Sequence, residues 1–181
     1  MKFSRRHVAA AGALMLAFAT LPAQAAEDPE NTLVMKLKCG DVVIRMRPDL
    51  APNHVAQIKK LTREGFYNGI IFHRVIDGFM AQTGDPTGTG TGGSKLPDIK
   101  GEFTPEPFVR GTVGMARAQD PDSANSQFFI MFATVSSLNG NYTVWGNVVK
   151  GMECVDQINR GEPPANPDKI IKMQVLKDIK Q

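Results

Sequence analysis

The sequence predicts a mainly β fold: a single antiparallel barrel or sandwich, closed or capped by two helices. Three observations predict it. The 181-residue chain is 42% hydrophobic, which suffices for one packed domain. Its 17 glycines and 12 prolines are typical of a turn-rich domain rather than of a helical bundle. Many short segments alternate apolar and polar residues, whereas only two segments have a helical pattern.

The first 25 residues have the pattern of a secretory signal peptide. Residues 1–7 are basic, residues 8–21 form an apolar run, and Ala23-Gln24-Ala25 matches a cleavage site. A membrane anchor is the alternative, but the run is shorter than the roughly 20 apolar residues that cross a bilayer. We therefore expect a signal peptide at 1–25, a single domain at 26–181 and a periplasmic location, with no membrane attachment of the mature form.

Charge and cysteine usage narrow the function classes. Three of the 21 basic residues lie in the signal segment, so the mature chain would have 18 basic and 18 acidic residues, a net charge of zero. This balance gives no basic footprint for nucleic acid. An exported compartment permits a disulfide between Cys39 and Cys154, but two free thiols fit the sequence equally well. No C-x-x-C motif indicates a redox or zinc site.

Each element follows from its periodicity. A hairpin with one buried face is expected at 32–38 and 42–47, because apolar residues alternate on both sides of the Cys39-Gly40-Asp41 turn. A helix is expected from Pro52 to about Gly65, since proline suits the first turn of a helix and glycine its end. The remaining expected elements are strands at 70–76, 79–82, 112–117, 127–132, 142–149 and 169–177, and a short helix at 152–158.

The glycine-rich segment 84–100 predicts a flexible surface loop. Residues 88–93 satisfy G-x-G-x-x-G, but no helix start follows the glycines to hold a pyrophosphate. The sequence also lacks metal-ligand spacing for His54 and His73, and it places no serine or cysteine beside a base. Asp120 and Asp122 are better read as turn formers than as a hydrolytic pair. We therefore expect no cofactor and no metal.

Arg74 is the chemical anomaly that remains. A guanidinium is always charged, yet this one lies between Phe72 and Val75-Ile76, with Phe79 and Met80 just past the Asp77-Gly78 turn. This pattern predicts a cation directed into an apolar pocket. Chemistry at such a site would need neither a nucleophile nor a proton transfer.

Four collinear motifs carry a resemblance to a known family: FHRVIDGFMAQTGD from residue 72, GTVGMARA from 111, NSQFFI from 125 and VWGNVVKGM from 144. They resemble the cyclophilin family of peptidyl-prolyl cis-trans isomerases over about 32–179. The resemblance implies an eight-stranded antiparallel closed β-barrel capped by two α-helices, no cofactor, and proline-containing polypeptides as partners. A monomer is expected.

The resemblance also implies roles for residues. Arg74 matches the catalytic arginine, and Gln82 matches the glutamine that orients it. The residues that match the pocket for the proline ring are Phe79, Met80, Phe129 and Leu138. Phe128 is one residue out of phase with Phe129 and is expected to pack inward. At Arg117 the common residue is asparagine and the family's contact is mainly through the backbone. The full implied set is catalytic Arg74, Phe79, Gln82 and Phe129, with substrate contacts at Met80, Ala116, Arg117, Gln127, Leu138 and Tyr142.

Two residues of this sequence depart from the pattern of the better-known relatives. Ser137 occupies the position of a tryptophan in cyclosporin-sensitive cyclophilins, and Tyr142 replaces a histidine; exported bacterial cyclophilins resemble this pattern. Weak binding of cyclosporin-type ligands is therefore expected. The leading hypothesis is an isomerase of X-Pro bonds that assists folding of exported proteins. The alternative is a proline-peptide binding module or chaperone with incidental isomerase activity, and a binding module would not need the cation.

Overall fold

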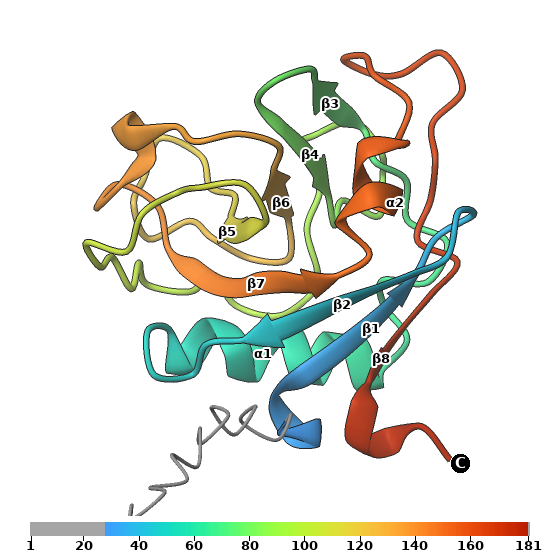
Figure 1. Cartoon of the computed structure of the whole chain (residues 1–181). Helices are drawn as coiled ribbons and strands as arrows, with labels where there is room; N and C mark the ends of the chain where they lie inside the picture. The colour runs from blue at the N-terminus through green and yellow to red at the C-terminus, as the bar shows by residue number, and fades with distance from the viewer. Residues whose placement is uncertain (1–27, 181) are drawn as a thin grey trace, which may run out of the picture.

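The computed structural model describes residues 28–180, so the predicted signal segment 1–25 lies outside the described residues. Eight antiparallel strands form one curled sheet in the order β3-β4-β6-β5-β7-β2-β1-β8 (Figure 1). The strands are β1 (Thr32–Lys36), β2 (Asp41–Met46), β3 (Arg74–Ile76), β4 (Met80–Thr83), β5 (Thr112–Met115), β6 (Phe128–Met131), β7 (Val144–Lys150) and β8 (Lys172–Val175). The helices are α1 (Pro52–Arg63) and α2 (Met152–Asp156), with 3-10 turns η1 (Pro29–Asn31), η2 (Ser136–Leu138) and η3 (Leu176–Asp178).

The predicted mainly β fold with eight strands and two helices is confirmed, but the predicted closure of the barrel is wrong. The sheet is a half-barrel whose edge strands β3 and β8 share no ladder. The segments that lead into these strands are joined by an isolated bridge between Ile71 and Lys169 and by a hydrogen bond from the Gly69 amide to the Ile170 carbonyl. The bridge is made by two hydrogen bonds, from the Phe72 amide to the Asp168 carbonyl and from the Ile170 amide to the Ile70 carbonyl. The expected strand at 70–76 is shorter in the structure, where β3 begins at Arg74.

The two helices lie on opposite sides of β2 in Figure 1. Helix α1 buries the predicted stripe of Val55, Ile58 and Leu61. Its N-terminus is capped from a distant loop, since both carboxylate oxygens of Glu102 accept backbone N–H groups, at 3.1 Å from Asn53 and 3.0 Å from His54. These bonds satisfy donors that a helix start leaves without partners.

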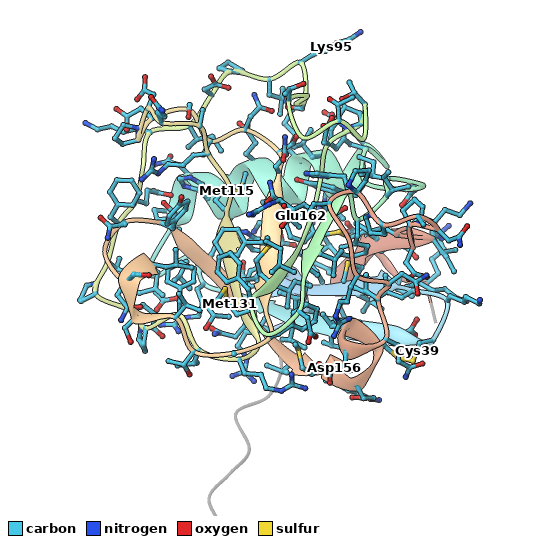
Figure 2. The ribbon with its side chains drawn as sticks, turned by 90° about the horizontal axis from the view of Figure 1, so that it is seen from above. Cys39, Lys95, Met115, Met131, Asp156 and Glu162 are labelled. Carbon is cyan, nitrogen blue, oxygen red and sulfur yellow. A yellow bond between two sulfur atoms is a disulfide. The ribbon has the colours of Figure 1, made fainter. Side chains whose placement is uncertain are left out.

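A disulfide resolves the cysteine alternatives. Cys39, in the turn between β1 and β2, is bonded to Cys154 in α2, with 5.3 Å between their Cα atoms. The yellow S–S bond is visible beside the Cys39 label in Figure 2. The bridge ties α2 to the strands that it covers.

The sheet separates two apolar clusters. Side chains alternate between the faces of a strand, and the register joins these alternating positions into rows. One row runs from Val75 through Ala81, Ile130 and Val113, all at most 1% exposed. These residues belong to the inner cluster, the main core inside the half-barrel. The outer cluster packs on the other face and consists of Met80, Phe108, Phe129, Met131 and Val144, with Leu50, Ile76, Phe79, Ala116, Val135, Leu138 and Tyr142 partly buried against it.

Candidate active site

Four paired residues form a row across the outer face of the sheet, and this row is the base of the candidate site. Arg74 on β3 pairs with Gln82 on β4, Gln82 pairs with Phe129 on β6, and Phe129 pairs with Gly114 on β5. Directly opposed residues in an antiparallel sheet project from the same face, with Cβ atoms about 5 Å apart. The register alone therefore brings the cation, the amide and the aromatic ring together.

A chain of hydrogen bonds orients the guanidinium. Nη1 of Arg74 donates to Oε1 of Gln82 at 3.4 Å, and Nε2 of Gln82 donates to Oε1 of Gln127 at 2.9 Å. Nε2 of Gln127 then donates to the carbonyls of Gly90 and Gly92, at 3.0 and 2.8 Å. The arginine side chain is still 41% exposed, so a ligand can reach it.

A cavity of about 130 Å³, lined by both apolar and polar side chains, opens beside this guanidinium. Its floor is formed by Met80 and Phe129, which are 1% and 5% exposed. Leu138 and Tyr142 form one wall, and the Tyr142 ring meets Phe129 edge-on with 5.8 Å between centroids. Nine of the ten site residues expected from the sequence line this cavity: Arg74, Phe79, Met80, Gln82, Ala116, Arg117, Phe129, Leu138 and Tyr142.

Gln127, the tenth residue, lines a neighbouring hollow of about 560 Å³ instead. Gln82, Ala116 and Arg117 line both spaces, so the two form one continuous groove. The far side of this hollow is the glycine-rich loop, with Gly90 to Ser94 among its lining residues.

Asp85 organises the glycine-rich loop from within. This side chain is 1% exposed and accepts bonds from the backbone amides of Thr87, Gly90 and Gly92. Burial raises the pKa of Asp85, but these hydrogen bonds and that of the Thr87 hydroxyl outweigh burial and lower the pKa to about 2. The expected loop does lie at the surface, and Lys95 projects from it in Figure 2. The sequence did not reveal its buried carboxylate anchor.

Arg117 contributes a side-chain contact that the sequence did not predict. Its guanidinium lies 4.6 Å from the centroid of the Tyr142 ring. It also donates to the carbonyls of Asn141 at 3.0 Å and Ala118 at 2.9 Å. A cation over an aromatic face is attracted by the ring quadrupole. Arg117 therefore fixes Tyr142, the wall residue on the side where Ser137 stands exposed.

Phe108 and Gly114 complete the floor and were also missed. The Phe108 ring stacks on Phe129 at 5.8 Å. A Cβ atom at Gly114 would lie only 2.5 Å from Cζ of Phe129 and 2.6 Å from Cε1 of Phe108. Glycine is thus required for the rings to lie as they do. The quoted GTVGMARA motif contains Gly114, but the motif alone does not show which rings approach it.

The arrangement can grip a small apolar ring and present a fixed cationic donor beside it. Neither histidine in residues 28–180 lines the cavity. No group of three or more His, Cys, Asp or Glu residues within 28–180 is placed to hold a metal ion. Across the same residues, no helix is both long and apolar enough to cross a membrane.

Comparison with known proteins agrees with this geometry. Residues 32–175 match the family model described as cyclophilin type peptidyl-prolyl cis-trans isomerase/CLD. The chain is 56% identical to a probable peptidyl-prolyl cis-trans isomerase of Brucella suis, over 99% of this chain and all of the relative. It is 41% identical to peptidyl-prolyl cis-trans isomerase B of Bacillus subtilis, over 67% of this chain and 85% of the relative.

Solved structures show the same fold. The cyclophilin AquaCyp293 from Hirschia baltica superposes with a TM-score of 0.78 at 31% identity, covering 84% of this chain and 76% of its own. A Cryptosporidium parvum cyclophilin crystallised in the presence of the dipeptide Ala-Pro gives 0.74 at 28% identity, covering 80% and 98%. The chain belongs to the cyclophilin-type peptidyl-prolyl cis-trans isomerases, a family of enzymes that bind proline-containing peptides.

Proposed function

We propose that this enzyme isomerises X-Pro bonds of exported proteins in the periplasm and so assists their folding, with Arg74 as its catalytic residue. One observation carries the assignment of Arg74: the register places its guanidinium, oriented by Gln82, at the mouth of a cavity floored by Phe129. A cavity with apolar side chains and the Arg74 donor beside them suits a prolyl ring whose nitrogen must be met by a hydrogen bond. The other arginine in the lining, Arg117, is already engaged by the carbonyls of Asn141 and Ala118.

The chemistry follows from the electronic structure of the peptide bond. Conjugation of the nitrogen lone pair with the carbonyl gives a rotation barrier of roughly 18–20 kcal/mol. Rotation breaks the conjugation and localises the lone pair on the prolyl nitrogen. A donor fixed on that nitrogen stabilises the twisted state more than either planar isomer, and this difference lowers the barrier. Arg74 supplies the donor without any nucleophile, metal or cofactor.

The residues around Arg74 hold the proline ring and contact the polypeptide on either side of it. Phe79, Met80, Phe129 and Leu138 hold the proline ring and exclude water, which strengthens the field of the guanidinium. In this proposal the polypeptide on either side of the proline runs along the groove, past Ala116, Arg117, Gln127 and Tyr142. The protein acts as a monomer on extended proline-containing chains.

Export is supported by two independent features. The pattern of residues 1–25 is that of a cleavable signal, and Cys39 and Cys154 form a disulfide. Disulfides persist in oxidising compartments such as the bacterial periplasm. Alkaline phosphatase fused after residue 40 would be active in a bacterial host if the leader exports it. An inactive fusion would contradict the periplasmic assignment.

Arg74→Ala is the direct test of the catalytic assignment. We expect kcat/KM for an X-Pro peptide to fall more than about tenfold, because the donor to the prolyl nitrogen is lost. Relaxation between the cis and trans peptide, followed by NMR exchange, gives the rate. Arg45→Ala is the matched control, since Arg45 is an exposed strand arginine on β2. Its rate should equal that of the wild type.

An unchanged rate in Arg74→Ala would refute the catalytic role of that residue. The binding-module alternative makes a different prediction, because a chaperone needs the groove but not the cation. Full complementation of a deletion strain by Arg74→Ala, despite loss of isomerisation, would favour that alternative.

Cyclosporin provides a second test. We expect weak inhibition of isomerisation, because Ser137 leaves the wall without a large apolar ring and an indole N–H donor. Ser137→Trp should tighten inhibition about tenfold or more, since burying one aromatic side chain contributes about 1.5–3 kcal/mol. Wild-type inhibition as tight as that of a tryptophan-bearing cyclophilin would contradict this expectation.

A further inference from the structure

A segment far from β3 in sequence is attached to the exposed edge of that strand. Gly161 forms an antiparallel bridge with Val75, with both backbone hydrogen bonds made, at 2.8 and 2.9 Å. Arg160 adds an ion pair with Asp77 at 3.2 Å and lies 4.3 Å from the centroid of the Phe132 ring. Three different contacts thus hold residues 160–161 in place.

This bridge determines where the next residue lies. In an antiparallel pair, the residue after Gly161 is opposite the residue before Val75, so Glu162 faces Arg74. Its Oε1 lies 3.6 Å from Nε of Arg74. Figure 2 shows Glu162 near the centre of the view and Cys39 near the lower right edge. The segment therefore extends the outer-face row by one position beyond β3.

Arg74 consequently lies between two oriented partners. Glu162 engages Nε from one side, and Gln82 accepts a hydrogen bond from Nη1 at 3.4 Å on the other. Arginine and lysine lose much rotamer freedom when they are held in one orientation. A guanidinium that is already oriented does not lose that freedom when it meets the nitrogen of the twisted bond.

We propose that Glu162 is a positioning residue for Arg74: its carboxylate holds Nε so that the rest of the guanidinium faces the prolyl nitrogen. The inference rests on the proposed catalytic role of Arg74. The ion pair contributes little to folding, because its side chains are 41% and 50% exposed and water screens them. Its effect lies in the turnover step, where the direction of the donor decides the rate.

The carboxylate also has an opposing effect, because a nearby negative charge weakens the field of the cation at the substrate. Screening at this exposed edge reduces that Coulomb effect. At low ionic strength the 3.6 Å ion pair is intact and its orienting effect exceeds this Coulomb effect on the substrate, so the loss of Glu162 lowers the rate rather than raising it.

Glu162→Gln tests the inference, because it removes the charge and keeps the size of the side chain. We expect kcat/KM on an end-blocked, uncharged X-Pro peptide to fall about three- to tenfold, mostly in kcat with KM little changed. The melting temperature should stay that of the wild type. Glu153→Gln is the matched control, since Glu153 is an exposed glutamate on α2, and it should leave kcat unchanged.

Ionic strength separates positioning from a generic structural effect. Salt screens an exposed ion pair, so wild-type kcat should fall toward that of Glu162→Gln as sodium chloride is added. The variant should show no such salt dependence. In an Arg74→Ala background, adding Glu162→Gln should change nothing further, since the group that it positions is gone.

The outcomes distinguish the two proposals. Loss of activity in Arg74→Ala with an unchanged or higher kcat in Glu162→Gln overturns the role of Glu162 and leaves the catalytic assignment standing. Retained activity in Arg74→Ala overturns the catalytic assignment itself. An equal loss from Glu162→Gln in the presence and absence of Arg74 would also overturn the positioning role.

Discussion

The inner and outer clusters are two faces of the same strands, but their surroundings differ. Inside the half-barrel, Phe128 is fully buried and meets Tyr67 and Trp145 edge-on, with 5.6 and 5.4 Å between centroids. On the outer face, Phe129 meets Phe108 and Tyr142 at 5.8 Å each, and it borders an open cavity. The inner cluster is enclosed by protein, whereas the outer cluster leaves one side for a ligand.

This difference shows how a short sequence serves both stability and function. One residue of shift along β6 moves a phenylalanine from the core to the site, because side chains alternate between faces. The same alternation separates Ala81, in the inner cluster, from Gln82, which orients Arg74. Substitutions at adjacent positions should therefore have different consequences.

The strongest contrast is expected between two adjacent residues of β6, Phe128 in the inner cluster and Phe129 in the outer cluster. Phe128→Ala should lower the free energy of unfolding by about 3–5 kcal/mol, because it leaves a cavity in the enclosed core. The activity of the fraction that remains folded should be close to that of the wild type. Phe129→Ala should lower kcat/KM more than about tenfold with a smaller loss of stability, since it removes the floor of the cavity beside Arg74.

Urea unfolding and peptide isomerisation on both variants check this pair. If Phe128→Ala proves too unstable to purify, Phe128→Leu keeps most of the volume and allows the same comparison. Equal losses of stability with equal losses of activity would show that the two faces do not divide their tasks.

Two glycines, one on each face of the sheet, should show the same division with smaller effects. Gly114 supports the outer rings, and a Cβ there would displace Phe129 and Phe108. Gly114→Ala should lower kcat/KM about tenfold, because small displacements at a site are costly to catalysis. Gly146 is on the inner row, where a Cβ would lie 3.0 Å from both Cγ2 of Ile44 and the Arg45 carbonyl oxygen. Gly146→Ala should cost about 1–3 kcal/mol of stability through overpacking.

Melting temperature and kcat/KM, measured on both glycine variants, distinguish the two expectations. An active Gly114→Ala enzyme would mean that Phe129 tolerates displacement. Loss of activity in a stable Gly146→Ala protein would place a catalytic requirement on the inner face.

Local patterns in the sequence predicted much of this division. The inward packing expected for Phe128 is observed, since it is fully buried, and the apolar stripe of α1 lies where periodicity placed it. The membership of the site came from the resemblance to the family rather than from periodicity. Neither source showed the row that joins Arg74, Gln82 and Phe129, because register between strands depends on pairing across the whole sheet.

Long-range features escaped prediction for a related reason. Glu162 lies in a proline-rich loop that has no motif, and only the bridge from Gly161 to Val75 brings it to the site. Closure of the barrel was an inference from the family and not from a pattern; the edges β3 and β8 stay separate. The Cys39–Cys154 pairing likewise required knowledge of how α2 packs on the first hairpin.

A fall in pH should lower the stability of the protein slightly and leave its activity unchanged. Burial lowers the pKa of His54 below its ordinary value of 6.5, against the opposing effect of the Glu102 carboxylate. Burial also lowers the pKa of His73, where Asp85 opposes the shift and Arg74 adds to it. Near pH 6 the unfolded chain therefore binds more protons than the folded one. By linkage, the free energy of unfolding falls as the pH falls below about 6.5.

Urea unfolding at pH 7.5 and 5.5 should show this loss, at most about 1.4 kcal/mol per pH unit for each histidine. His73→Gln should reduce the slope, because one of the two groups no longer titrates. The cavity beside Arg74 is lined by neither histidine, so kcat/KM of the folded enzyme should stay flat between about pH 6 and 8, where arginine remains charged. A bell-shaped rate profile in that range would mean that a titrating group takes part in the reaction, and the outer face could then no longer be described as a site of fixed charge and shape alone.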